Sequence, residues 1–175
     1  DLQGNKQKSA SWYRNAVSLI ADRSSPSELF ASGKLLGRPS AGRMAMFFYD
    51  PKFKQRLPYY DTFPLVLPLE PMKGGFIGLN FHYLPYGARF AFLQQLQKYS
   101  SNAKFDQSTK IQASYNAIKG NKYTKASIKR YLYSHVRSQF LRVNVNEMAL
   151  AAYLPVAQFQ GATLGQVFAR SRKTY

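Results

Sequence analysis

Between positions 122 and 142 the sequence concentrates positive charge and contains no acidic residue. The cations are Lys122, Lys125, Lys129, Arg130, Arg137 and Arg142, and Tyr123, Tyr131 and Tyr133 lie among them. Lysine and arginine neutralise phosphate groups, and tyrosine rings stack on bases or pack against sugars. The pattern therefore predicts a surface that binds nucleic acid without reading its sequence. A second predicted patch consists of Lys52, Lys54 and Arg56.

The whole chain shares this excess of positive charge. It has 25 lysines and arginines against 8 aspartates and glutamates, a formal net charge of +17. A folded protein with such self-repulsion is usually matched by a polyanion, so we expect double-stranded DNA to be the main partner. If about six of the cations each neutralise a phosphate, log affinity should fall with log salt at a slope near −5. A solvated basic surface, or contact with an acidic neighbouring protein, is the alternative explanation.

Few residues could catalyse a reaction. Asp61, Glu70 and Lys73 could supply the two carboxylates and the lysine with which metal-dependent nucleases hold Mg²⁺ and activate water. In such nucleases the acid and the lysine usually lie two positions apart, on the same face of a strand. Glu70 and Lys73 are instead three positions apart, and one of the two residues between them is Pro71. We therefore expect no catalytic residue and no metal, and we assign Asp50 and Asp61 to turns. A nuclease is kept as the third interpretation of function.

Other classes of site have little support in the sequence. His82 and His135 lie beside aromatic residues, and we expect both to be hydrogen-bonded packing residues. The absence of cysteine excludes disulfides and thiolate zinc sites. No apolar run approaches the roughly 18 to 20 residues of a membrane span, so we expect no membrane association. We expect no cofactor either.

The elements that must position the cations begin with a β unit between Met44 and Leu84. Its apolar runs have the length of strands and cover residues 44–49, 63–69 and 75–83. Asp50-Pro51 predicts a turn that ends the first run. Prolines predict that the middle strand lies at an edge, is bulged or pairs only in part; they are Pro58, Pro64 and Pro68. Glycines predict unusual backbone angles or close approaches at Gly74, Gly75 and Gly78.

Helices are expected to cover this sheet. The first should follow Pro85 and run to about Tyr99, and the last should run from about Thr163 to Arg172. Between them we expect a helix after Asp106, a helix over 124–143 with the basic residues opposite its buried side, and a short helix that starts at Asn144 or Asn146 and ends at Tyr153.

The sequence thus predicts an α+β fold, with a small twisted, barrel-like antiparallel sheet covered by C-terminal helices. Residues 44–175 are expected to form a single domain, made of the β unit 44–84 and a helical part 85–175. Residues 1–43 are expected to form an extended N-terminal arm, with a short helix from Trp12 through Asp22 and a connector over 23–43.

The segments YDPKFKQRLPYYDTFPLVLPL and GGFIGLNFHYLP, within Met46 to Pro85, resemble the DNA end protector proteins of contractile-tailed bacteriophages. Weaker similarity is found in SWYRNAV, IKRYLYSHVRSQF and AAYLPVAQF. The resemblance implies a non-enzymatic virion protein of the head or the head–tail neck, present in the host cytoplasm during assembly. Such a protein would bind the ends of packaged double-stranded DNA and shield them from host exonuclease. No residue roles are carried over from the family.

The resemblance also implies that other virion proteins of the head, neck or tail are partners in a multi-subunit assembly. The alternative function is therefore that of a neck or baseplate adaptor. Its contacts would be made with proteins, through the N-terminal arm and exposed aromatic residues.

Overall fold

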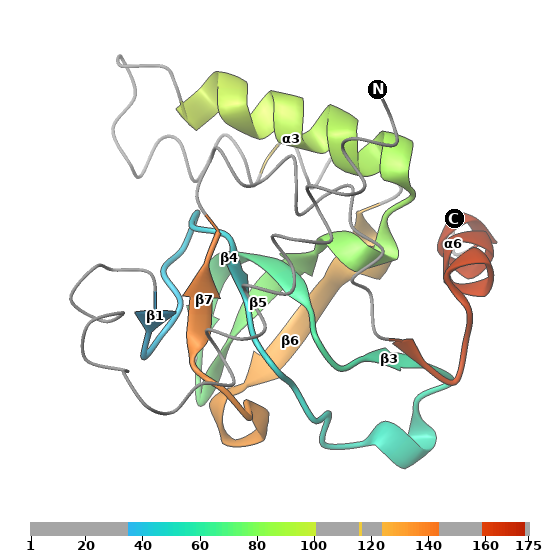
Figure 1. Ribbon diagram of the computed structural model, residues 1–175, viewed down its shortest axis with the longest axis horizontal. Helices are drawn as coiled ribbons and strands as arrows, with labels where there is room; N and C mark the ends of the chain where they lie inside the picture. The colour runs from blue at the N-terminus through green and yellow to red at the C-terminus, as the bar shows by residue number, and fades with distance from the viewer. Residues whose placement is uncertain (1–34, 101–115, 117–123, 144–158, 174–175) are drawn as a thin grey trace.

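The computed structural model describes residues 35–100, 116, 124–143 and 159–173, with the side chains of 95–100, 172 and 173 excepted (Figure 1). Most of its strands form one antiparallel six-stranded sheet. In spatial order these are β1 (Leu35–Leu36), β7 (Phe140–Arg142), β2 (Ala45–Met46), β4 (Leu65–Met72), β5 (Gly75–Asn80) and β6 (Ile128–Leu132). A second, two-stranded sheet pairs β3 (Tyr60–Asp61) with β8 (Phe159–Gln160).

Short 3-10 helices and two α-helices complete the described fold. The 3-10 helices are η1 (Lys54–Arg56), η2 (Phe81–Tyr83), η3 (Lys125–Ser127) and η4 (Tyr133–His135), and the α-helices are α3 (Tyr86–Ser100) and α6 (Leu164–Lys173). No helix in the described ranges is long and apolar enough to cross a bilayer.

The two longest strands of the sheet form the β4–β5 hairpin, which confirms two of the expected strand runs. Its turn contains Gly74 at φ 75°, a left-handed angle that suits glycine. The register shifts between Pro68 and Glu70, so the prolines produce a bulge, one of the outcomes expected for this strand. The strand is not at an edge, because β2 pairs with its other side.

The predicted helix over 124–143 is wrong. This segment forms η3, β6, η4 and β7 instead. Its apolar residues recur every fourth position, at Ile128, Leu132, Val136 and Phe140, and that spacing suits one face of a strand as well as one face of a helix. Pairing with β5 decides the outcome, since Ile128 lies opposite Leu79 and Tyr131 opposite Phe76. Two strands from the C-terminal half therefore belong to the sheet.

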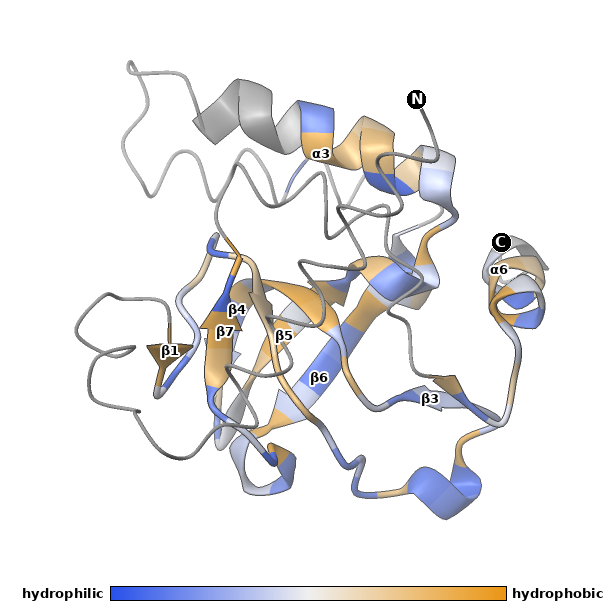
Figure 2. Cartoon of the chain, in the orientation of Figure 1, coloured by the Kyte–Doolittle hydropathy of each residue, from blue (hydrophilic) through white to orange (hydrophobic). Residues whose placement is uncertain are grey.

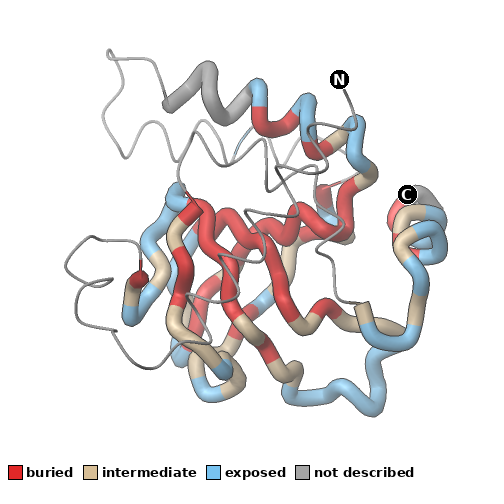
Figure 3. Tube along the Cα trace, in the orientation of Figure 1, coloured by how far each residue is buried: buried red, intermediate tan, exposed pale blue. Residues whose placement is uncertain are grey.

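The barrel-like closure is also wrong, because the sheet is open and ends at β1 and β6. Alternating residues instead make both faces apolar. Figures 2 and 3 show that much of the central strands is hydrophobic and buried. Leu65 and Leu67 pack with Phe92 and Leu93 of α3 on one face. On the other face Val66 joins an aromatic cluster that consists of Phe47, Tyr49, Phe76, Tyr131 and Phe140. The α+β class is confirmed, with a sheet larger than 44–83 alone could form.

The first and last predicted C-terminal helices are confirmed. α3 begins after Pro85, and α6 buries Val167, with a capping box in which Thr163 and Gln166 bond each other's backbone N–H. The expected helices at 12–22 and at 144–153 lie outside the described residues. So does the helix after Asp106, apart from Asn116, which is helical. The division into an arm and one domain stays a prediction, and Leu35–Leu36 of the expected connector form β1.

Candidate nucleic-acid interface

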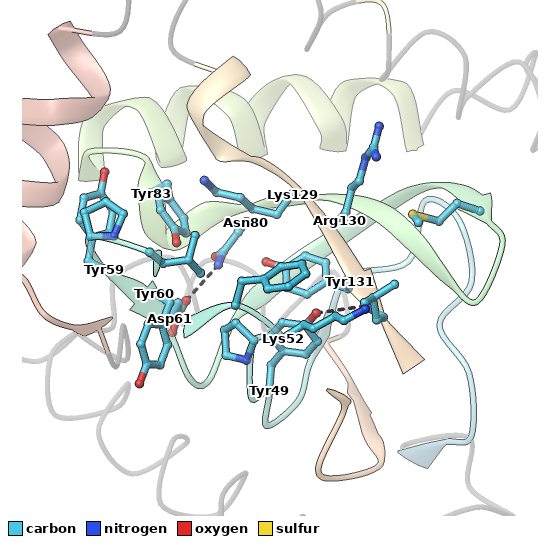
Figure 4. A pocket seen from close by; sticks show the side chains of 16 residues that line it. Tyr49, Lys52, Tyr59, Tyr60, Asp61, Asn80, Tyr83, Lys129, Arg130 and Tyr131 are labelled. Atoms are coloured by element: carbon cyan, nitrogen blue, oxygen red, sulfur yellow. Dashed lines mark hydrogen bonds between the residues drawn. The ribbon is translucent and has the colours of Figure 1, made fainter. Parts of the chain in front are cut away.

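A cavity of about 540 Å³ lies beside the edge strand β6, on the sheet face opposite α3. Its second wall is the loop that connects Tyr49 to Asp61. Three of the predicted cations line it, namely Lys52, Lys129 and Arg130. Six aromatic residues line it as well: Tyr49, Phe53, Tyr59, Tyr60, Tyr83 and Tyr131. The fold thus brings one residue of the second predicted patch, Lys52, and two of the first, Lys129 and Arg130, to one aromatic cavity (Figure 4).

The loop is fastened to the C-terminal strands at its base. Tyr49 forms a bridge with Val136, and its hydroxyl accepts a hydrogen bond of 3.1 Å from the backbone N–H of Leu132. The N–H of Asp50 donates to the carbonyl of His135 at 3.0 Å. The His135 Nδ1 lies 2.9 Å from the carbonyl of Asp50, which confirms that this histidine is a hydrogen-bonded packing residue. These bonds fix the loop opposite β6.

Pairing with β5 sets the position of β6. Gly78 lies opposite Lys129 and Gly75 opposite Leu132. A Cβ atom on Gly75 would lie 1.9 Å from the carbonyl oxygen of Tyr131, so only glycine permits this approach of the strands. The close approaches expected at Gly75 and Gly78 are confirmed, since a Cβ on Gly78 would lie 2.3 Å from Val66 Cγ1.

Successive β6 side chains take opposite directions. Lys129 lies on the side of the cavity, where its Nζ sits 4.2 Å from the centre of the Tyr83 ring. Arg130 is exposed, and Figure 4 shows its guanidinium extending away from the other labelled side chains. Lys129 therefore belongs to the cavity itself, whereas Arg130 belongs to its outer rim.

The electrostatics of Lys129 favour an anionic ligand. Burial lowers the pKa of its ammonium group, because the charged form loses hydration. Within the described ranges no carboxylate lies within ion-pair distance of it. Burial, together with the charges of Asp61 and Tyr59, raises the pKa of Tyr83, so its phenol stays neutral. An anion bound here would restore some of the interaction energy that Lys129 loses on burial.

The floor of the cavity contains a buried carboxylate that is already engaged. Asp61 Oδ2 lies 2.6 Å from Nδ1 of His82 and accepts a 3.0 Å hydrogen bond from the Asn80 amide. Its Oδ1 accepts from the N–H of Phe63 at 3.1 Å, which confirms its role in a turn. Burial alone would raise the pKa of Asp61, but the His82 charge and these hydrogen bonds outweigh it and hold the pKa below its usual value.

The trio considered for a nuclease is not arranged as one. Asp61 is 4% exposed, whereas Glu70 and Lys73 are exposed on the β4–β5 hairpin. In the described segments no group of three or more histidine, aspartate or glutamate residues could hold a metal ion. His82 is fully buried and bonded to Asp61, which confirms it as a packing residue.

Two predicted cations are paired with one acidic residue. Lys54 Nζ lies 2.8 Å from Asp50 Oδ1, and Arg137 Nη2 lies 3.8 Å from Asp50 Oδ2. The hydrogen bond with Lys54 is the main cause that lowers the pKa of Asp50, so the carboxylate stays charged at neutral pH. Both cations are therefore partly neutralised within the protein.

Three further predicted cations, Arg56, Lys125 and Arg142, do not line the cavity. Lys52 Nζ and Arg56 Cζ lie 5.2 and 5.9 Å from the centre of the Phe53 ring, which is 55% exposed at the cavity rim. Lys125 lies on η3 and Arg142 on β7. Lys122 lies outside the described residues.

Sequence reasoning missed two features of this region. The rings of Tyr59, Tyr60 and Tyr83 were not singled out, although the PYYD segment that follows the basic patch contains two of them. Arg89 was missed too: it is fully buried, and its guanidinium donates to the carbonyls of Leu84 and His82 at 2.8 and 3.1 Å. Burial lowers the pKa of Arg89 to about 10, so it remains a cation that fastens α3 to η2.

Comparison with known proteins agrees with the resemblance found in the sequence. The family model described as Phage T4 terminal DNA protecting protein matches residues 3–173. Neither a curated protein nor a solved structure matches the chain. The match covers nearly every residue, including those that build the cavity, and the chain therefore belongs to the Phage T4 terminal DNA protecting protein family.

Proposed function

We propose that this protein is a non-enzymatic structural component of a tailed phage particle. In this role it binds double-stranded DNA without sequence specificity and shields the ends of the packaged genome. Family membership supports the link to phage DNA ends. The net charge of +17 supports a polyanionic partner.

The observation that carries the proposal is the convergence of Lys52 with Lys129 and Arg130 at one cavity. The two segments are far apart in the sequence, and each supplies exposed cations together with aromatic rings. Cations contact phosphates whatever the bases are, and the amide and carboxylate in the wall, Asn80 and Asp61, are bonded to each other. Such a surface favours sequence-independent binding.

The salt dependence of DNA binding measures how many cations contact phosphates. Lys52, Arg56, Lys129 and Arg130 are not ion-paired within the described part of the chain. If each neutralises one phosphate, together they contribute about −3.6 to the slope of log affinity against log salt. Lys54 and Arg137 contribute less to this slope than the sequence suggests, because Asp50 competes with phosphate for both cations.

Two measurements on the full chain test the proposal. Fluorescence anisotropy with two unrelated duplexes at rising salt should give equal affinities and a steep salt dependence. Digestion of a linear duplex by a purified exonuclease should slow in proportion to the fraction of DNA bound. Absence of duplex binding at low salt would refute the proposal and favour the neck or baseplate adaptor. Mg²⁺-dependent cleavage by the protein itself would favour the nuclease.

A further inference from the structure

We propose that the cavity beside β6 holds the terminal nucleotide of a DNA strand, with its base against the tyrosine rings and its phosphate at Lys129. The inference rests on the proposed DNA binding and adds to it a site that tells an end from the duplex interior.

The volume fits one nucleotide and excludes a duplex. About 540 Å³ lies within the roughly 300 to 1,000 Å³ of small-molecule pockets. A cube of that volume is about 8 Å on a side, whereas the major groove of B-DNA alone is about 12 Å wide. Duplex DNA can therefore lie only across the rim, and whatever enters the cavity must leave the stack.

The lining has the chemistry of a nucleotide site. Tyr59 and Tyr60 are partly exposed and offer ring faces on which a base can stack. Tyr59 is itself held in place, because its ring lies 6.0 Å from the ring of Tyr83 and 6.0 Å from that of Phe159. Phe53 adds a ring at the rim, flanked by Lys52 and Arg56. A preorganised aromatic wall lowers the entropic cost of stacking.

Lys129 supplies the charge inside the site. It is half-buried, its Nζ lies over the Tyr83 ring at 4.2 Å, and no carboxylate of the described chain pairs with it. Asp61 in the floor does not repel a phosphate at full strength, since its two oxygens are engaged by His82, Asn80 and Phe63. A cation that is partly desolvated and lacks an anion favours a phosphate of the ligand.

A terminal nucleotide can enter the cavity at a lower free-energy cost than a nucleotide within the duplex. A base within the duplex must be unpaired and unstacked from two neighbours before it can leave the helix. A base at an end is stacked on one side only, and a single-stranded overhang requires no unpairing. The cavity would therefore select ends, while the rim cations bind any duplex.

The test compares one duplex in two forms, with open ends and with both ends closed by hairpin loops. Wild-type protein should bind the open form about tenfold more tightly, which corresponds to stacking of one base. A short single-stranded overhang should increase that preference further. Equal affinity for the open and closed forms would overturn the terminal-nucleotide site and leave the proposed duplex binding intact. Binding of neither form would overturn both.

Adjacent variants identify the cavity as the source of the preference. Lys129→Met removes the charge inside the cavity and keeps the length of the side chain. Arg130→Met removes the same charge from the neighbouring residue, which extends away from the cavity. Lys129→Met should reduce the preference for open ends, whereas Arg130→Met should weaken the binding of both forms equally. Phe53→Ala, at a residue 55% exposed, should reduce the preference without affecting folding. Retention of the preference in both Lys129→Met and Phe53→Ala would overturn the assignment.

Discussion

Asp50 lies between two of the basic residues that the sequence assigns to DNA binding, with Oδ1 2.8 Å from Lys54 Nζ and Oδ2 3.8 Å from Arg137 Nη2. The carboxylate joins the basic loop to the segment that follows β6. It therefore withholds positive charge from a phosphate at the place where the two basic patches meet.

Asp50→Asn should strengthen DNA binding at low salt. The change releases Lys54 and Arg137, so it should steepen the slope of log affinity against log salt by up to about 1.8. Glu70→Gln removes one negative charge from an exposed position that forms no ion pair with any residue the structure describes, and it serves as the matched control. If the two variants change the slope equally, only net charge matters, and the pairing at Asp50 has no role in binding.

Asp61→Asn should destabilise the fold by about 1 to 3 kcal/mol. The new amide can accept from the Phe63 N–H through its oxygen, but its NH₂ group would then face the amide donor of Asn80, and the anion 2.6 Å from His82 Nδ1 would be lost. Denaturant unfolding monitored by circular dichroism measures the loss, and exposed Asp50→Asn is the control. An unchanged midpoint would mean that the buried network contributes nothing to stability.

The same carboxylate predicts a pH dependence. Because the folded-state pKa of Asp61 is lowered, ionised Asp61 stabilises the fold fully above its unfolded pKa of about 3.9. This contribution is lost as the pH falls through the folded pKa. The unfolding free energy of the wild type should therefore decline below about pH 4, and that of Asp61→Asn should decline less. Parallel pH profiles for the two proteins would contradict the assignment.

Gly75→Ala should displace β6 and destabilise the protein by at least about 1 to 3 kcal/mol. The added Cβ would meet the backbone of Tyr131 at 1.9 Å, and a backbone cannot move aside as a flexible side chain can. Gly37→Ala is the control, because its Cβ would have no neighbour within 4 Å. Unchanged stability of Gly75→Ala in thermal unfolding would show that β5 and β6 are less closely paired.

The sequence was informative where local chemistry decides structure. Gly74 and the prolines of β4 determine the hairpin and its bulge, and Pro85 marks the start of α3. The sequence was misleading at β6, because apolar residues at every fourth position fit one face of a strand as well as one face of a helix. The strand that pairs with it, β5, lies far upstream in the sequence. The nonlocal pairing with β5 could not be read from the segment itself.

The candidate site was predictable residue by residue but not as an assembly. Lys52 and Lys129 were identified as cations, yet their convergence depends on strand order. The pairing of Lys54 with Asp50 is an i,i+4 relation that could have been read locally. The approach of Arg137 to the same carboxylate depends on the long-range bridge between Tyr49 and Val136.

The central claim is that Lys52, Lys129 and Arg130 form one DNA-binding surface. The most direct test is the salt dependence of duplex binding for wild type and for the triple variant Lys52→Met, Lys129→Met and Arg130→Met. The account predicts that the slope of log affinity against log salt becomes shallower by about 2.7 in the variant. A slope that stays the same would show that phosphates are bound elsewhere on the chain and would contradict the account.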